Sequence, residues 1–318
     1  MDILLAKPRG FCAGVNRAIA IVRSALAEFG APVYVLHEIV HNTHVLHELR
    51  SLGAIFVEEL EQIPPGARTI FSAHGIAKSV EDQAAAMHLR TIDATCPLVA
   101  KVHRRIIRLH TQGCTLLVLG HKRHPEVEGT CGQVPGPVYV VSSPEEVAAL
   151  PIPDSSKIGY VTQTTLSVDD TKDMLAALRS RFRLIEEPDR TDICYATTNR
   201  QIAVRQLAEH CDVVLIVGSK NSSNSNRLRE VAAAQDIPSY LIDHADEIDT
   251  NWLMGKKRIG VSAGASAPEH LVKGVLTRLQ ALAPGKVEEM GGEDEQVTFP
   301  VCGLHKTSGK SDTLKVNR

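Results

Sequence analysis

The chain has 318 residues, of which 43% are hydrophobic and 23% are charged, with a formal net charge of −2 at pH 7. This composition suits a globular enzyme with two or three small domains, and the near balance of charge gives no reason to expect binding to nucleic acid or to a membrane surface. Because no apolar run approaches the ~20 residues that span a bilayer, and the amino-terminal residues lack the apolar stretch of a signal peptide, we expect a cytoplasmic protein.

The chain repeats one pattern three times, and each copy opens with a cysteine: Cys12, Cys96 and Cys194. Each cysteine precedes a stretch of helical periodicity, at residues 15–29, 98–110 and 198–210. A short apolar run, predicted as a strand, comes next in each copy: Val33–Leu36, Thr115–Leu119 and Val213–Val217. Polar loops follow at residues 37–42, 120–126 and 218–224. Such an alternation of strands and helices predicts parallel α/β units.

Polar residues recur at a nearly fixed distance from the three cysteines. His41, His124 and Asn224 lie 29, 28 and 30 residues after them. Each copy also contains a second apolar run that passes into a small polar loop, at residues 69–75, 157–164 and 258–266. Ligands of parallel α/β sheets bind beyond the carboxyl ends of the strands, so these loops are the predicted binding site.

The repeats predict an α/β fold built from three similar α/β domains. The first unit spans residues 13–96 and the second spans 97–193, whereas the third combines residues 1–12 with 194–282. Residues 283–302 are a C-terminal extension. Residues 303–318 are polar, basic and without periodicity, so we predict a mobile tail.

The seven cysteines of the chain differ in context. Cys114 and Cys211 precede equivalent strands, where a small buried residue is expected. Cys131 and Cys302 have no counterparts in the other units. The three cysteines that open the units each stand beside a polar turn and before a helix, whose amino terminus favours a thiolate.

Three converging thiolates make a soft-ligand metal site. Structural zinc takes four protein ligands, and the chain has no Cys-x-x-Cys pair to complete such a site. An iron–sulfur cluster with one iron open to substrate is therefore favoured, and zinc remains an alternative.

The polar loops also have ordinary structural interpretations. His37, His41, His44 and His47 could coat a solvated helix face, and His74 could complete a turn. Residues 221–226 could form a solvated loop and a helix cap, and Glu126 could pair with Lys122. The repeated register of His41, His124 and Asn224 favours a shared function instead.

Six ordered motifs resemble the hydroxymethylbutenyl diphosphate reductase family, also called IspH or LytB. They are PRGFCAGV at 8–15, SAHG at 72–75, DATCP at 93–97, HPEVEG at 124–129, TQTT at 162–165 and GSKNSSNSNRL at 218–228. The resemblance runs in order from residue 1 to about residue 300. It implies a trefoil of three α/β domains with pseudo-threefold symmetry around one central 4Fe-4S cluster, which three cysteines hold with one iron left open.

The resemblance also implies a reaction and assigns residues to it. That family reductively dehydroxylates 4-hydroxy-3-methylbut-2-enyl diphosphate to isopentenyl and dimethylallyl diphosphates, the last step of the methylerythritol phosphate route to isoprenoids. Its cluster ligands match Cys12, Cys96 and Cys194. Its diphosphate-binding positions match His41, His74, Ser222, Asn224 and Ser266, with Ser223 and His124 nearby. Its proton-delivery positions match Glu126 and Thr164, so Glu126, Thr164 and His124 are the expected catalytic residues, and the last two are also expected to touch the substrate.

Two other functions stay open at this point. A redox sensor could use the same cluster without turnover, and an iron–sulfur hydro-lyase could bind a hydroxyl group on the open iron without needing a reductant. A reductase needs an electron donor, for which the resemblance implies reduced ferredoxin or flavodoxin.

Overall fold

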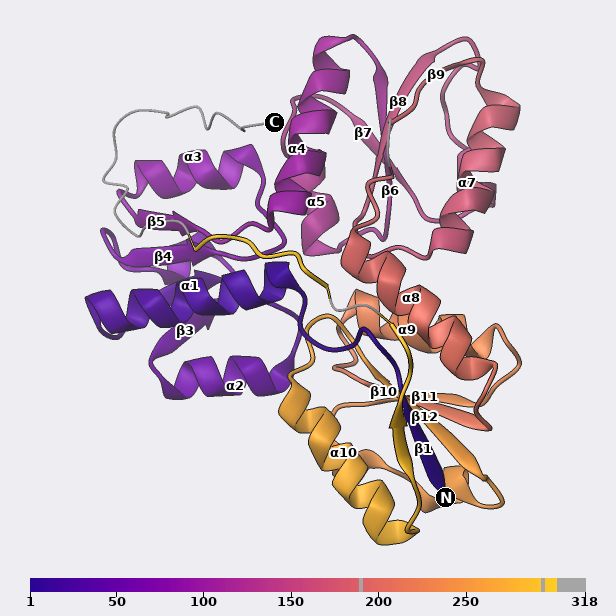
Figure 1. The fold of residues 1–318 in the computed structure, drawn as a ribbon. Coiled ribbons are helices and arrows are strands. Elements are labelled where there is room, and N and C mark those ends of the chain that lie inside the picture. The colour runs from indigo at the N-terminus through magenta and orange to yellow at the C-terminus, as the bar shows by residue number, and fades with distance from the viewer. Residues whose placement is uncertain (189–190, 293–294, 302–318) are drawn as a thin grey trace.

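Three parallel β-sheets form the framework of the computed structural model, which describes residues 1–188, 191–292 and 295–301 (Figure 1). One sheet has the strand order β3-β2-β4-β5, the second has the order β7-β6-β8-β9, and the third has the order β11-β10-β12-β1-β13. All strand pairs in the three sheets are parallel. The predicted class, α/β with three similar units, is confirmed.

The strands of the first and second sheets are β2 (Val33–Leu36), β3 (Ala54–Val57), β4 (Arg68–Phe71), β5 (Arg90–Asp93), β6 (Thr115–Leu119), β7 (Val138–Val141), β8 (Lys157–Thr162) and β9 (Leu184–Glu186). The strands of the third sheet are β1 (Asp2–Leu5), β10 (Val213–Val217), β11 (Ser239–Ile242), β12 (Arg258–Ala263) and β13 (Val287–Glu289). The helices are α1 (Ala13–Phe29), α2 (Thr43–Ser51), α3 (Lys78–Ala86), α4 (Pro97–Thr111), α5 (Pro125–Cys131), α6 (Pro144–Ala148), α7 (Val168–Arg181), α8 (Tyr195–Ala208), α9 (Ser223–Ala233) and α10 (Glu269–Leu282), with 3-10 turns at Leu60–Gln62, Ala245–Glu247 and Thr250–Leu253.

Apolar side chains explain why the strands form where they do. The central strand β10 is VVLIV, and all five of its residues are buried. Parallel strands are covered on both faces, so they appear in the sequence as continuous apolar runs. Each sheet accordingly packs against two apolar clusters, with the helices of its unit on either side. The predicted bounds of β2, β6 and β10 are confirmed to the residue.

The helices that follow the three cysteines begin earlier than their apolar periodicity predicts. Helix α1 starts at Ala13, α4 at Pro97 and α8 at Tyr195, each directly after its cysteine. The cysteine is therefore the N-cap residue in all three cases. The residues between each cysteine and the predicted start are Ala13 and Gly14 in α1 and residues 195–197 in α8, and they show no repeating apolar pattern although the backbone is already helical.

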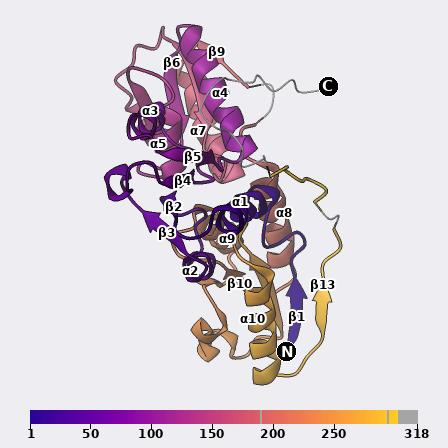
Figure 2. The ribbon, with the colours of Figure 1, turned by 90° about the vertical axis from the view of Figure 1, so that its left-hand side faces the viewer.

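The three units surround a common centre, toward which the amino-terminal ends of α1, α4 and α8 point (Figures 1 and 2). The amino-terminal strand β1 lies between β12 and β13 in the third sheet, so the first and last strands of the described residues complete the same unit. The exact domain boundaries at residues 13–96, 97–193 and 194–282 stay a prediction.

The C-terminal extension joins the third unit to the first. After β13 it passes α8, where the Glu295 carboxylate accepts hydrogen bonds from the Arg200 guanidinium at 3.0 and 3.1 Å. The carbonyl of Pro300 then accepts from Nε of Arg17 on α1 at 3.0 Å. Cys302 and the predicted mobile tail at residues 303–318 lie outside the described residues. Within the described ranges, every helix is too short or too polar to cross a bilayer.

Candidate active site

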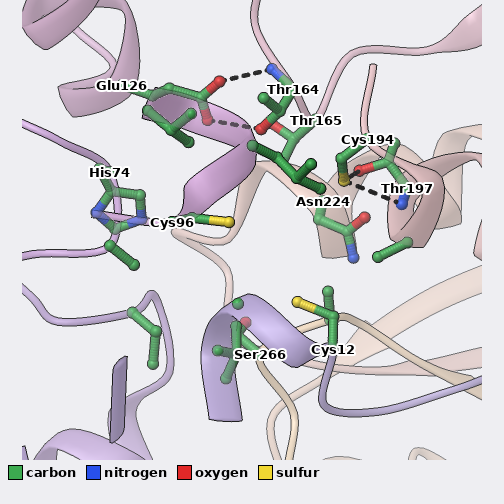
Figure 3. A pocket seen from close by; sticks show the side chains of 18 of the residues that line it. Cys12, His74, Cys96, Glu126, Thr164, Thr165, Cys194, Thr197, Asn224 and Ser266 are labelled. Carbon is green, nitrogen blue, oxygen red and sulfur yellow. Dashed lines mark hydrogen bonds between the residues drawn. The ribbon is translucent and has the colours of Figure 1, made fainter. Parts of the chain in front are cut away.

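The three unit-opening cysteines face one cavity of about 110 Å³ at the centre of the molecule (Figure 3). Cys12, Cys96 and Cys194 are the N-caps of three different helices, so the free N–H groups of three helix termini converge on this cavity. The Cys194 sulfur accepts from the Thr197 backbone N–H at 3.3 Å, and the Thr197 hydroxyl lies 3.1 Å from it. Oriented donors of this kind stabilise a thiolate and surround a bound anionic cluster.

Gly14 leaves room beside two of these sulfurs. A Cβ atom at this position would lie 2.7 Å from Sγ of Cys96 and 3.8 Å from Sγ of Cys12. Any larger residue would fill the space in which a group bound to both sulfurs has to sit. Among the described residues, no three His, Cys, Asp or Glu side chains are close enough to hold a single metal ion. The three thiols with this space between them therefore fit a larger cluster better than a lone zinc ion.

Burial, rather than the helix dipole, dominates the acidity of two of the free thiols. The pKa of Cys96 is raised to about 12 and that of Cys194 to about 11, chiefly by burial and to a lesser degree by the neighbouring cysteines. The backbone N–H groups, and for Cys194 the Thr197 hydroxyl, lower the pKa of these thiols as their position before a helix predicts, but the loss of hydration outweighs them. A bound metal supplies the positive charge that reverses this balance, so deprotonation and metal binding are coupled.

Three histidines make up the side of the cavity next to the first and second units. The rings of His41 and His74 stack with centroids 4.2 Å apart, and the ring of His124 lies 5.5 Å from His41 and 5.8 Å from His74, edge-on to both. Burial and the neighbouring histidines hold the pKa of His74 well below its usual value and lower that of His124 to about 3. These two rings are therefore neutral hydrogen-bonding groups near neutral pH.

Several polar atoms that face this cavity have no partner in the described part of the chain. Nε2 of His41 and both side-chain heteroatoms of Asn224 are buried without a hydrogen bond. Buried polar groups in native proteins are rarely left unpaired, so these atoms indicate a polar ligand. Ser222 and Ser266 lie beside them, with hydroxyl groups 3.5 Å apart, and both line the cavity with Ser223.

Glu126 enters the cavity from the first turn of α5 and is held by a single neighbour. Its two carboxylate oxygens accept from the Thr164 backbone N–H at 2.6 Å and from the Thr164 hydroxyl at 2.9 Å (Figure 3). Only 3% of its surface is exposed. Burial raises the pKa of Glu126 to about 7, although the Thr164 hydrogen bonds oppose the shift. A carboxyl group with this pKa can both hold and release a proton near neutrality.

The structure does not support two of the ordinary structural interpretations of the polar loops. Lys122 pairs with Glu146 rather than with Glu126. His44 and His47 lie on α2, whereas His41 precedes that helix and faces the cavity.

Ser222 has both roles, because its hydroxyl caps α9 by accepting from the Ser225 N–H at 3.3 Å while it lines the cavity. Cys114 and Cys211 are buried as expected. All twelve predicted site residues line the central cavity: Cys12, His41, His74, Cys96, His124, Glu126, Thr164, Cys194, Ser222, Ser223, Asn224 and Ser266.

Sequence reasoning missed two aromatic residues that also line the cavity. Tyr195 directly follows Cys194, and its hydroxyl accepts from the Ala13 N–H at 3.4 Å, which links the starts of α1 and α8. Because Tyr195 is next to Cys194 in the sequence, its place at the site could have been predicted. Phe299 comes from the C-terminal extension, and nothing in that aperiodic segment predicts that it returns to the centre.

A family model described as LytB protein matches residues 3–280. The chain belongs to the LytB family. It is 55% identical over 298 residues to the 4-hydroxy-3-methylbut-2-enyl diphosphate reductase of Neisseria gonorrhoeae, which covers 93% of this chain and 92% of the relative. It is 56% identical over 297 residues to the corresponding reductase 1 of Rhodopseudomonas palustris, with 93% and 97% covered.

The LytB fold is also recognisable in solved structures. The E-1-hydroxy-2-methyl-but-2-enyl-4-diphosphate reductase of Plasmodium falciparum superposes with a TM-score of 0.90 at 37% identity, over 93% of each chain. A second solved structure, an (E)-4-hydroxy-3-methyl-but-2-enyl diphosphate reductase, superposes with a TM-score of 0.63 at 35% identity, over 88% of this chain and 99% of the other.

Proposed function

We propose that this LytB protein is a 4-hydroxy-3-methylbut-2-enyl diphosphate reductase, which removes the allylic hydroxyl of its substrate to give isopentenyl and dimethylallyl diphosphates. The reaction consumes two electrons and two protons and releases water, so the atoms and electrons balance. The observation that carries the proposal is one cavity that combines three cysteines, unpartnered donors for a diphosphate, and a buried carboxyl group.

Membership of the family implies an iron–sulfur cluster. We propose a 4Fe-4S cluster held by Cys12, Cys96 and Cys194, with one iron lacking a protein ligand. The three thiols and the space beside Gly14 fit such a group. When bound, it supplies the electrons and a Lewis-acidic iron for the substrate hydroxyl.

The polar side chains of the cavity divide the remaining tasks between them. The diphosphate is proposed to bind His41, His74, Ser222, Asn224 and Ser266, with Ser223 and His124 beside it. Many separate hydrogen-bond donors replace an arginine clamp here, and their preset positions limit the entropy lost on binding.

Glu126 is proposed to deliver protons, and Thr164 to hold its carboxyl group in place and to touch the substrate. A proton given to the departing hydroxyl turns a poor leaving group into water. His124 caps α5 by accepting from the Glu126 backbone N–H at 3.2 Å, so it positions the helical turn that carries the acid.

The source of electrons is a further part of the proposal. Reduced ferredoxin or flavodoxin suits a cluster that takes electrons one at a time. A cytoplasmic location, where thiols stay reduced, suits the six free cysteines of the described residues.

The decisive experiment offers the substrate to anaerobically purified protein with and without a chemical reductant. The proposal requires both products, at one molecule of product for every two electrons consumed. Turnover without reductant would indicate a hydro-lyase, and a redox change without any turnover would indicate a sensor; either outcome would refute the reductase.

A further inference from the structure

Glu38 connects the first and third units at the edge of the cavity. Its Oε2 atom accepts from Nδ1 of His41 at 2.8 Å and from the side-chain amide of Asn221 at 2.7 Å. Glu38 and His41 follow β2, whereas Asn221 follows β10 of the third sheet. A single carboxylate oxygen therefore fixes the His41 ring and also bridges two units of the fold.

The two nitrogens of His41 face different surroundings. Nδ1 meets the Glu38 carboxylate, whereas Nε2 is buried without a partner in the described residues and belongs to a ring that lines the cavity. The second observation is independent of the first, because an unpaired buried nitrogen indicates a ligand whatever holds the other side of the ring.

We propose that Glu38 is a positioning residue that obliges His41 to carry two ring protons whenever a diphosphate is bound. The inference rests on the proposed function and extends it. A carboxylate and a diphosphate oxygen are both acceptors, so a ring placed between them needs a proton on each nitrogen. Binding of the ligand thus draws one proton from solvent onto His41.

The other titratable groups around His41 do not compete for this proton. His74 and His124 are the neighbouring rings, and neither is hydrogen-bonded to a carboxylate in the described part of the chain. His37 is on the same loop and Glu126 lies across the cavity, and neither side chain is hydrogen-bonded to the His41 ring in the described part of the chain. Glu38 is the one carboxylate bonded to a ring of this group among the residues described.

Replacing Glu38 by Gln keeps the size of the side chain but removes the need for a proton on both ring nitrogens of His41. A glutamine amide can turn its NH₂ group toward Nδ1, which lets a neutral ring keep its single proton on Nε2 and donate it to the phosphate. In Glu38→Ala, a water molecule can donate to Nδ1 of His41 in the same way, so a neutral ring can again keep its proton on Nε2. Asn221 can reverse its own amide to pair with the new residue.

Isothermal titration calorimetry with inorganic pyrophosphate tests this directly. The anaerobic, cluster-loaded protein is titrated near pH 8 in two buffers of different ionisation enthalpy, which gives the number of protons taken up. Wild type should take up about one proton more than Glu38→Gln or Glu38→Ala. As pH rises, its affinity for pyrophosphate should also fall more steeply than theirs, by up to about a further tenfold per pH unit. Glu48→Gln, an exposed carboxylate of the same unit that pairs with Arg23, should match wild type.

Each outcome decides the inference. Greater proton uptake by wild type than by both Glu38 variants, with unchanged melting temperatures, supports the inference. Equal uptake and equal pH slopes in wild type and both Glu38 variants would overturn this inference alone. Failure of pyrophosphate to bind wild type would overturn the diphosphate site as well, so the two failures are distinguishable.

Discussion

Glu126 shows how local surroundings turn a common residue into a candidate acid. Its sequence motif identifies a carboxylate after a strand, but only the fold shows that Thr164 supplies both of its hydrogen bonds and that the group is buried. Burial is a tertiary property, so the raised pKa of Glu126 could not be predicted from residues 124–129 alone.

Glu126→Gln should lower turnover by about 10²–10⁴-fold, because the amide keeps the size and hydrogen bonding of the side chain but has no transferable proton. Substrate affinity and the iron content should stay close to wild type. Glu128→Gln, on the exposed face of the same helix, is the matched control and should leave turnover unchanged. Normal turnover by Glu126→Gln would make Glu126 structural.

The pKa of about 7 for Glu126 also predicts a pH profile. Above that pH the carboxyl group loses its proton, so the rate of the protonation step should fall as pH rises. The same shift affects stability: a carboxyl whose pKa in the folded state exceeds its ordinary value stabilises the fold fully below that ordinary value, and this contribution is lost as pH rises to about 7. The free energy of unfolding of wild type should therefore fall relative to that of Glu126→Gln as pH rises from 4 to 8. A difference between the two proteins that does not change with pH would refute the shifted pKa.

At the scale of elements, the sequence predicts strands better than helix starts. The apolar runs of β2, β6 and β10 set their bounds directly, whereas α1 and α8 begin at their capping cysteines, before any apolar periodicity. Contacts between units were not predictable. Glu38 meets Asn221 and Phe299 returns to the cavity only through the packing of the whole chain.

The three capping cysteines should be separable from the packing cysteines by substitution. Cys12→Ser, Cys96→Ser and Cys194→Ser should each remove most of the bound iron and sulfide from anaerobically purified protein. Cys114→Ser and Cys211→Ser change thiols that are buried in apolar clusters and should keep it. Equal iron contents in all five variants would place the cluster elsewhere.

The C-terminal extension should contribute to stability through Glu295. Its partner Arg200 is 1% exposed and also donates to the Gly10 carbonyl at 2.8 Å, beside the Cys12 turn. Glu295→Ala leaves that guanidinium buried without its carboxylate, which should reduce the free energy of unfolding by about 3–5 kcal/mol.

Glu289→Ala is the matched comparison for Glu295→Ala. It removes a carboxylate that is 44% exposed and pairs with Arg9. Chemical denaturation should show a loss of about 0–1 kcal/mol for this variant. Similar losses in the free energy of unfolding for both variants would mean that the Glu295–Arg200 pair does not stabilise the docking of the extension.

At the scale of the whole molecule, the cysteines that precede the first helix of each α/β unit meet at a centre that no single unit could form alone. The repeated order of cysteine, helix, strand and polar loop made this arrangement predictable. Equivalent positions in the three units have diverged, so that His41, His124 and Asn224 face the same cavity with different chemistry. The site is therefore a joint product of symmetry in the fold and asymmetry in the side chains.

Mössbauer spectroscopy of anaerobic, ⁵⁷Fe-labelled protein tests the central claim most directly. With three cysteine ligands, about one iron in four should differ from the rest, and only that iron should respond when the substrate is added. A spectrum in which all irons are alike and stay unchanged with substrate would contradict a cluster held by three cysteines with one iron open to the substrate.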